Sequence, residues 1–335
     1  MDVLSIRLHS NDKLKTDDKT LFKFSFKKKS KQQLLGLEIR ADCINGIVVA
    51  YEDKKRPLLQ KKLSFPYANR SMLGSALTHV INEAKCNVCS ITLSPSFYQL
   101  LLLDAADVSD SELGEAMKWR VSEINNRDVN DLVVDAFRLP ADSYRGRMSM
   151  CYTAITEKPL IKEIVAGVES TKSSIVYIGI NEISIAQLIN NLPAFQGLNM
   201  VLIKPDKTGG MLCLMDSAQL YLCRTLEGNY GYETNQNEEQ VDDALVENLA
   251  LDIQRSMDYY ESQLGKDGIE IGLIFLDGES GLLIVDKLNE KLDIPITPFV
   301  LNDLFESSDE VCDPKFAPAV GAALFARSKS YVANN

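Results

Sequence analysis

Histidine is nearly absent from this chain of 335 residues, which contains only His9 and His79. A Ser-His-Asp triad needs a histidine beside its nucleophile, and structural zinc sites often use histidine ligands. The two histidines lie far apart, one in the N-terminal tail and one in a predicted helix. The sequence therefore gives no support for a hydrolase triad or for a zinc site with histidine ligands.

Long apolar runs are also lacking. None reaches the roughly 18–20 residues that a membrane-spanning helix requires, and the N-terminus has no apolar signal-peptide core. The seven cysteines are an odd number scattered through predicted strands, which favours reduced thiols in a cytoplasmic protein. Cys86 and Cys89 form a single C-x-x-C without a second ligand pair, and we interpret them as two small apolar residues.

Basic residues are scarce outside the N-terminal segment. The formal net charge is −11, yet residues 1–33 carry nine Lys/Arg and four Asp/Glu, so the remainder is −16. An acidic body argues against nucleic-acid binding, which needs a basic face. Within the predicted mobile tail 1–33, residues 22–31 interleave Phe and Lys, a pattern that fits contact with an anionic membrane surface. A solvated basic tail is the alternative reading.

Two similar stretches organise the rest of the chain. Val201–Leu226 reads as three short apolar strands separated by polar turns, and Leu34–Phe65 has the same strand–turn–strand–turn–strand pattern. The two meanders begin about half a chain apart. We therefore predict two lobes built on one repeated plan.

Helical patterns alternate with strands through most of the sequence, so we predict an α/β fold. Ser109–Glu112 is a capping box that opens a helix, Val241–Leu264 carries the longest apolar stripe, and Pro318–Arg327 reads as a last small-residue helix. The predicted domains are a tail at 1–33, a first lobe at 34–199 with a small α+β domain inserted at 88–140, a second lobe at 200–328 and a frayed end at 329–335.

Several stretches, taken in order, resemble motifs of the PilM family of type IV pilus assembly proteins, which includes proteins of mannose-sensitive haemagglutinin (MSHA) pili. The most specific match is LALDIQRSMDYYESQ at Leu249–Gln263. The resemblance implies the two-lobed actin/FtsA-like ATPase fold. The other matching stretches are LLGLEI at Leu34–Ile39, Val108–Asp135, IGINEISIAQLI at Ile178–Ile189 (with Asn181 at the usual Asp), Ile274–Gly281 and Phe316–Arg327.

The same resemblance implies a nucleotide site that has lost its usual residues. Actin-like ATPases bind phosphates in one glycine turn per lobe, and an Asp at each turn serves Mg²⁺. Here Glu38 stands at the first Asp and Arg40 at the glycine, so we expect ATP and Mg²⁺ to bind weakly or not at all. A phosphate contact by Arg40 itself is the alternative. The candidate residues of this vestigial site are Glu38, Arg40, Asp206, Gly209, Gly210 and Gly278.

By resemblance, the chain is expected to be a non-enzymatic, cytoplasmic component of the inner-membrane platform of a type IV pilus. The partner implied is a PilN-like single-pass membrane protein, whose cytoplasmic tail would bind beside the inserted domain. The alternative is an ATP-binding switch that couples nucleotide state to partner binding. The expected groove residues are Phe97, Leu100, Leu102 and Trp119, although filling the core of the small domain is the other reading for each.

Overall fold

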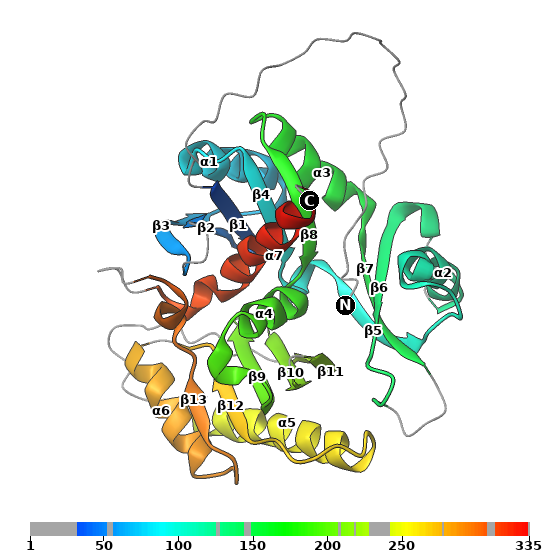
Figure 1. Cartoon of the computed structure of the whole chain (residues 1–335), viewed down its shortest axis with the longest axis vertical. Coiled ribbons are helices and arrows are strands. Elements are labelled where there is room, and N and C mark those ends of the chain that lie inside the picture. Colours follow the sequence, from blue (N-terminus) through cyan, green and yellow to red (C-terminus); the bar gives the residue numbers. More distant parts are fainter. Residues whose placement is uncertain are drawn as a thin grey trace.

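In the part of the chain that the structure describes, three β-sheets form the framework, two with five strands and one with three. Figure 1 shows how they are arranged. The structure is a computed structural model and describes residues 32–51, 56–124, 128–143, 149–206, 209–217, 219–227, 242–276, 278–306 and 312–333. The predicted membrane-contact stretch 22–31 lies outside the described residues. Helices cover the sheets, which confirms the predicted α/β class.

The first sheet opens with the predicted meander and has the strand order β3-β2-β1-β4-β8. β1 pairs with β2 in antiparallel and with β4 in parallel orientation, so it lies at the centre of a mixed sheet. The strands are β1 (Gln32–Ile39), β2 (Cys43–Tyr51), β3 (Leu58–Pro66), β4 (Val88–Leu93) and β8 (Ser174–Ile180).

The second sheet repeats this plan with the order β11-β10-β9-β12-β13. Again the first strand of a meander is central, antiparallel to the next strand and parallel to a later one. The predicted internal repeat is therefore present in the strand topology. The strands are β9 (Asn199–Asp206), β10 (Gly209–Asp216), β11 (Gln219–Leu226), β12 (Ile271–Ile274) and β13 (Ile296–Pro298).

Four helices cover the first sheet. α1 (Leu73–Ala84) and α3 (Lys158–Glu169) share one hydrophobic cluster with it, because each helix presents apolar residues at three- and four-residue spacing. α4 (Asn181–Asn190) and α7 (Ala317–Ala333) belong to another cluster. α7 lies so close to β1 that a Cβ on Gly36 would sit 1.9 Å from the carbonyl oxygen of Ala319.

The position of α7 corrects two predicted boundaries. The helix packs on β1 and β4 of the first sheet, so the second lobe does not continue to residue 328 as predicted. It also runs to Ala333 instead of ending at Arg327. The polar residues after Arg327 suggested fraying, but they include no glycine or proline that would end a helix.

The second sheet is covered by α5 (Asp243–Ser262) and α6 (Gly278–Asn289). The predicted long helix is confirmed with slightly shorter ends, and Asp242 caps it by accepting a hydrogen bond from the Ala244 N–H at 2.9 Å. Its buried stripe lies against the sheet because residues at this spacing share one face. That stripe is Val246, Leu249, Ala250, Ile253, Ser256, Met257 and Tyr260.

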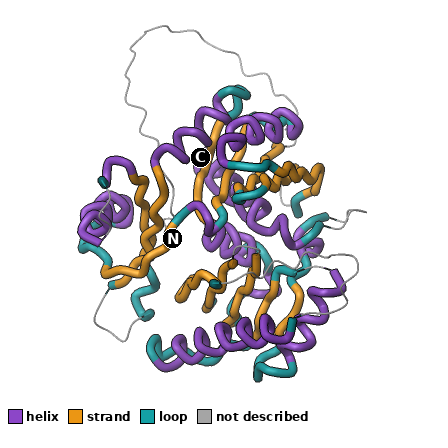
Figure 2. Tube along the Cα trace, turned by 180° about the vertical axis from the view of Figure 1, so that it is seen from behind, coloured by secondary structure: helices purple, strands orange, loops and turns teal. Residues whose placement is uncertain are grey.

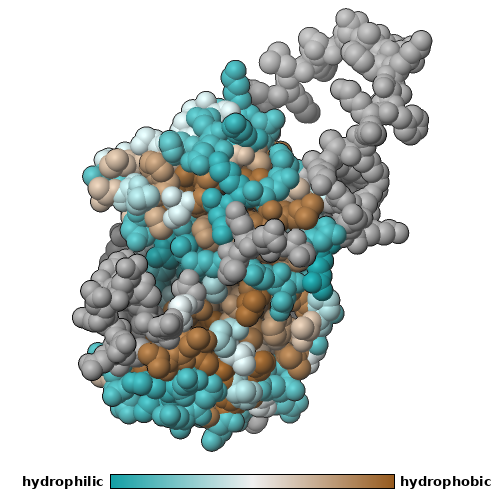
Figure 3. All heavy atoms as spheres, turned by 90° about the vertical axis from the view of Figure 1, so that its left-hand side faces the viewer, coloured by the Kyte–Doolittle hydropathy of each residue, from teal (hydrophilic) through white to brown (hydrophobic). Residues whose placement is uncertain are grey.

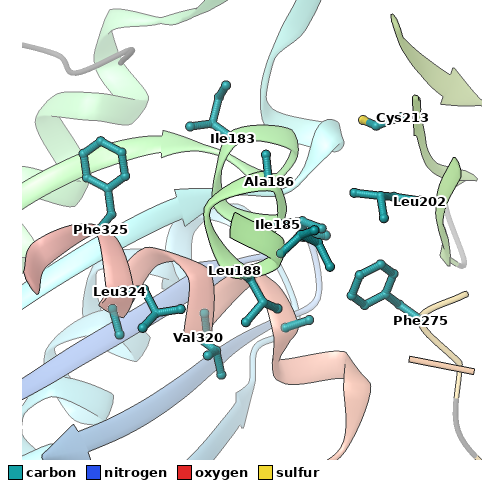
Figure 4. Packing of buried hydrophobic residues seen from close by; sticks show 14 of the residues in the cluster. Ile183, Ile185, Ala186, Leu188, Leu202, Cys213, Phe275, Val320, Leu324 and Phe325 are labelled. Atoms are coloured by element: carbon teal, nitrogen blue, oxygen red, sulfur yellow. The ribbon is translucent and has the colours of Figure 1, made fainter. Parts of the chain in front are cut away.

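The two lobes share a continuous core through α4. Figure 4 shows Ile185 and Leu188 of α4 between Val320 and Leu324 of α7 on one side and Leu202 of β9 on the other. The helix is buried along most of its length, including its polar residues Asn181, Glu182 and Ser184.

The small third sheet has the order β5-β7-β6 and lies beside the first lobe (Figure 2). It is formed by β5 (Gln99–Asp104), β6 (Leu132–Arg138) and β7 (Met150–Glu157), with α2 (Asp110–Ile124) on one face. The predicted range 88–140 is wrong at both ends. Val88–Leu93 pairs with β1 and β8 in the first sheet, whereas β7 belongs to the small one.

Short 3₁₀ helices connect several of these elements. They span Arg70–Met72, Pro95–Phe97, Val129–Asp131, Pro193–Phe195, Leu301–Leu304 and Pro314–Phe316.

The surface is mixed. Figure 3 shows a face with hydrophilic side chains at its two ends and hydrophobic ones in bands between them. Within the described ranges, no helix is both long and apolar enough to cross a membrane. Large hydrophobic side chains that remain exposed come from elements of all three parts: Met72, Val108, Trp119, Ile124, Leu251, Leu282, Leu283 and Val300.

Candidate functional site: a groove beside the small sheet and an ion cluster between the lobes

A cavity of about 530 Å³ lies between the first lobe and the small sheet. We call it the groove. One wall comes from the β1–β2 turn, the chain after β3 and the start of α3, and the other from the ends of β5, β6 and β7. The lining residues are Ala41, Tyr67, Arg70, Ser96, Phe97, Tyr98, Gln99, Leu132, Ile155, Thr156, Glu157 and Leu160.

The first-lobe wall is fixed by backbone hydrogen bonds to the β1–β2 turn. The Tyr67 N–H donates to the Asp42 carbonyl oxygen at 2.9 Å, and the Tyr67 hydroxyl donates to the Arg40 carbonyl oxygen. Arg70 follows, with its guanidinium carbon 5.7 Å from the centre of the Phe97 ring. This cation–π contact joins the two walls at the groove surface.

Two side-chain hydrogen bonds hold the opposite wall. Thr156 Oγ1 donates to the Phe97 carbonyl oxygen at 2.7 Å, and the Tyr98 hydroxyl donates to the buried carboxylate of Glu182. Burial raises the pKa of Glu182 above its ordinary value, although the Tyr98 hydrogen bond opposes this rise. The groove thus combines apolar floor residues with polar groups on its rim.

Of the four residues predicted to line the groove, only Phe97 does so. Leu100 and Leu102 are partly buried on the face of the small sheet that packs against the main core. Trp119 is 77% exposed, because it lies on the face of α2 opposite the buried Met117. The prediction that these four side chains gather in one place was wrong.

The two predicted phosphate turns meet across the lobes through a paired salt bridge. Arg40 follows β1, and Asp206 ends β9. The Arg40 Nη2 donates to Asp206 Oδ1 at 2.8 Å, and Nη1 donates to Asp206 Oδ2. Only 15% of the Arg40 side chain and 10% of the Asp206 side chain are exposed. Two parallel guanidinium–carboxylate bonds are the strongest form of this interaction.

A second charge pair lies beneath the first. Glu38 is fully buried, and its Oε1 lies 3.5 Å from Lys204 Nζ, which is itself 3.4 Å from Asp206 Oδ2. Asn181 Nδ2 donates to Glu38 Oε1 at 2.8 Å, and Asn45 Nδ2 donates to Oε2 at 3.4 Å. We call Glu38, Arg40, Lys204 and Asp206 the inter-lobe ion cluster.

The cluster is balanced in charge, with two cations and two carboxylates. Burial alone would lower the pKa of the Arg40 guanidinium, but the negative charges of Glu38 and Asp206 raise it above its ordinary value. Arg40 therefore stays charged. Pairing of this kind is what allows four ionised side chains to persist away from water.

The three predicted glycines lie in two places: Gly209 and Gly210 in the β9–β10 hairpin next to Asp206, and Gly278 at the start of α6. Gly209 pairs with Asp206 in the β9–β10 hairpin, and Gly210 follows it. At Gly210 φ is +150°, and a Cβ would sit 2.3 Å from the Lys204 carbonyl oxygen, so only glycine fits. Gly278 starts α6 at a φ of +73°, and the adjoining Asp277 lies outside the described residues.

The residues present do not fit Mg²⁺ and nucleotide phosphates. Both carboxylates that would serve the metal or its waters already face a lysine or an arginine, and the Arg40 guanidinium lies between the two turns. Phosphate would have to displace the Arg40–Asp206 pair. In the described part of the chain, no group of three or more His, Cys, Asp or Glu is arranged to hold a metal ion.

Sequence reasoning missed Lys204 and the rim residues of the groove. Lys204 had a usable signal: a lysine at the end of the apolar run Val201–Ile203, buried in a central strand, needs a carboxylate partner. Tyr67 and Arg70 have no such signal in the sequence, because the wall they form exists only once the small sheet is in place.

Two sheets with the same meander plan, joined by buried helices, define the actin-like ATPase fold, and the comparisons agree. Among solved structures, the chain is similar to the "PilM-PilN type IV pilus biogenesis complex", with a TM-score of 0.70 and 17% identity over 88% of this chain and 99% of that one. It is also similar to a Bacteroides thetaiotaomicron protein with actin-like ATPase fold and unknown function, with a TM-score of 0.51 and 11% identity over 83% and 94%. No family model and no curated protein matches the sequence.

At these identities the likeness establishes the fold. The chain has a PilM-like, actin-like ATPase fold, as predicted.

Proposed function

We propose that this chain is a cytoplasmic scaffold at the inner-membrane platform of a type IV pilus. In this proposal the groove captures the N-terminal cytoplasmic tail of a PilN-like single-pass membrane protein. The observation that carries the proposal is a groove at the junction of the first lobe and the small sheet, on a fold similar to that of a PilM–PilN complex. The sequence motifs further suggest an MSHA-type pilus and a protein of the MshI kind.

The lining of the groove suits an extended peptide. Leu132, Ile155 and Leu160 offer apolar contacts to every second side chain of a bound extended peptide. Arg70 and Glu157 place opposite charges at the rim. A short tail that buries a few apolar anchors would bind with micromolar affinity, about −8 kcal/mol. Binding of this kind needs no nucleotide.

The inter-lobe ion cluster supports the proposal that the vestigial nucleotide site no longer binds ATP. Each of its carboxylates already has a cationic partner, so Mg²⁺ and phosphate would have to break existing bonds. The alternative, an ATP-dependent switch, requires that nucleotide open this cluster. We therefore favour a degenerate ATPase that acts by binding protein partners.

Matched charge substitutions test the tail site. Glu157 is exposed on the rim of the groove, and Glu123 is exposed near the end of α2, a helix that contributes no lining residue. Glu157→Lys should abolish co-purification of the PilN-like tail, and Glu123→Lys should not. Neither should change the melting temperature by more than about 1–2 °C, since both side chains are exposed.

Two results would contradict the assignment. If Glu157→Lys and a second rim variant, Gln99→Lys, both capture the tail as well as the wild-type protein does, the groove is not the binding site. Loss of capture in Trp119→Ser, with the rim variants unaffected, would place the binding surface on the outer face of α2.

A further inference from the structure

The first wall of the groove is tied to the second lobe by the Arg40–Asp206 pair. Arg40 belongs to the β1–β2 turn, whose next residue, Ala41, lines the groove. The Arg40 carbonyl oxygen also accepts the hydrogen bond of Tyr67, another lining residue. Asp206 belongs to β9 of the second sheet. The Arg40–Asp206 pair therefore connects this wall to the other lobe.

The second wall is tied to the second lobe at a different place. The Tyr152 hydroxyl, on β7, donates to the Cys223 carbonyl oxygen at 3.1 Å and accepts from the Cys223 N–H at 2.7 Å. β11, which contains Cys223, is the edge strand of the second sheet. Tyr152 thus occupies the backbone groups that an edge strand would otherwise present, and β7 continues from it to Ile155, which lines the groove.

A polar contact after β6 adds to this second attachment. Lys266, which follows α5, contacts the Asp142 carboxylate and lies 3.0 Å from the Tyr221 hydroxyl, and that hydroxyl donates to Asp142 Oδ1 at 2.9 Å. Asp142 follows β6 of the small sheet. The end of the small sheet is therefore bound to the second lobe by side chains as well as through β11.

Both walls of the groove are thus anchored on the second lobe at separate points, yet none of the anchoring side chains lines the groove. We propose that the second lobe sets the spacing of the groove walls through these two attachments, and so controls the affinity of whatever peptide binds there. This inference rests on the proposed function for the identity of the ligand, but its geometric part stands without it.

The coupling works because the two attachments are rigid. A buried paired salt bridge and a doubly bonded hydroxyl each tolerate little displacement before they break. Movement of the second lobe relative to the first would therefore move the β1–β2 turn, the small sheet, or both. A ligand that prefers one wall spacing would favour the corresponding lobe position, and the effect is reciprocal.

Two variants weaken one attachment each without altering a lining residue. Asp206→Asn removes the charge that holds Arg40, and Tyr152→Phe removes the hydroxyl that holds β11. Asp243→Asn is the matched control for Asp206→Asn, because Asp243 pairs with Lys287 between α5 and α6, inside the second lobe. Two independent attachments keep the test open if one variant proves unstable.

The first readout is amide hydrogen exchange of the full-length protein without ligand. Asp206→Asn should speed exchange in 67–70, and Tyr152→Phe should speed it in 96–99 and 155–157. Asp243→Asn should leave all three segments unchanged. Unchanged exchange of these segments in both test variants would overturn the proposal, whatever binds in the groove.

The second readout is the dissociation constant of a synthetic PilN-like tail. Each test variant should weaken binding roughly fivefold or more, the usual lower range of coupling between sites, and the control should not. If both test variants bind the tail with wild-type affinity, the second lobe does not control binding in the groove. If the wild-type protein binds no tail at all, the proposed function fails, and hydrogen exchange alone decides whether the lobe sets the groove.

Discussion

Replacing Asp206 by alanine should lower the free energy of unfolding by about 2–3 kcal/mol. The change removes two charge-assisted hydrogen bonds and leaves Arg40 mostly buried. Loss of one partner of a buried pair commonly costs about 3–5 kcal/mol. We expect less because Arg40 Nε keeps its contact with Asp42 at 3.3 Å, and the charge of Glu38 still attracts it.

A double-mutant cycle isolates this pair from other effects. Arg40→Ala, Asp206→Ala and the double variant would be unfolded in urea alongside the wild-type protein, with two spectroscopic probes to check that the transitions coincide. We expect a coupling energy of about 1.5–3 kcal/mol, since the two partners contact each other directly. A value below about 0.5 kcal/mol would refute a strong attachment between the lobes.

Three further predictions concern other contacts. Tyr152→Phe should lower the free energy of unfolding by about 1–3 kcal/mol, measured in urea, because it leaves two buried backbone groups of Cys223 unpaired; no change would mean that water replaces the hydroxyl. Gly36→Ala should cost at least about 1–3 kcal/mol by forcing α7 away at Ala319, and a melting temperature equal to wild type would contradict that packing. Because burial raises the pKa of Glu182, the folded state binds its proton more tightly than the unfolded state does. The free energy of unfolding should therefore rise as the pH falls through the raised pKa of Glu182 towards the ordinary glutamate value. Glu182→Gln should remove that rise in paired urea titrations, and an identical pH dependence in both proteins would show that Glu182 is not responsible.

The two meanders were predictable from the sequence because their signals are local. Polar turn residues interrupt apolar runs at strand-length spacing in both halves of the chain. The long helix α5 was equally clear from its apolar stripe. The partner of each strand is not a local property, and for this reason Val88–Leu93 was assigned to the small domain when it pairs with β1 and β8.

The candidate site was only partly predictable for the same reason. Arg40 stands out as a charged residue where a phosphate turn would need glycine, yet its partner Asp206 is 166 residues away. Trp119 was expected in the groove as an apolar side chain of the inserted-domain region, but which face of a helix a residue occupies depends on its position around the helical turn. Counting from the buried Met117 puts Trp119 on the opposite side.

Side-by-side calorimetry is the most direct test of the account. The full-length protein would be titrated with Mg-ATP and, separately, with a synthetic PilN-like cytoplasmic tail. We expect micromolar binding of the tail, lost in Glu157→Lys, and no measurable heat from Mg-ATP at millimolar concentration. Tight binding of Mg-ATP without any binding of the tail would contradict the proposal that the chain is a scaffold whose nucleotide site is replaced by the inter-lobe ion cluster.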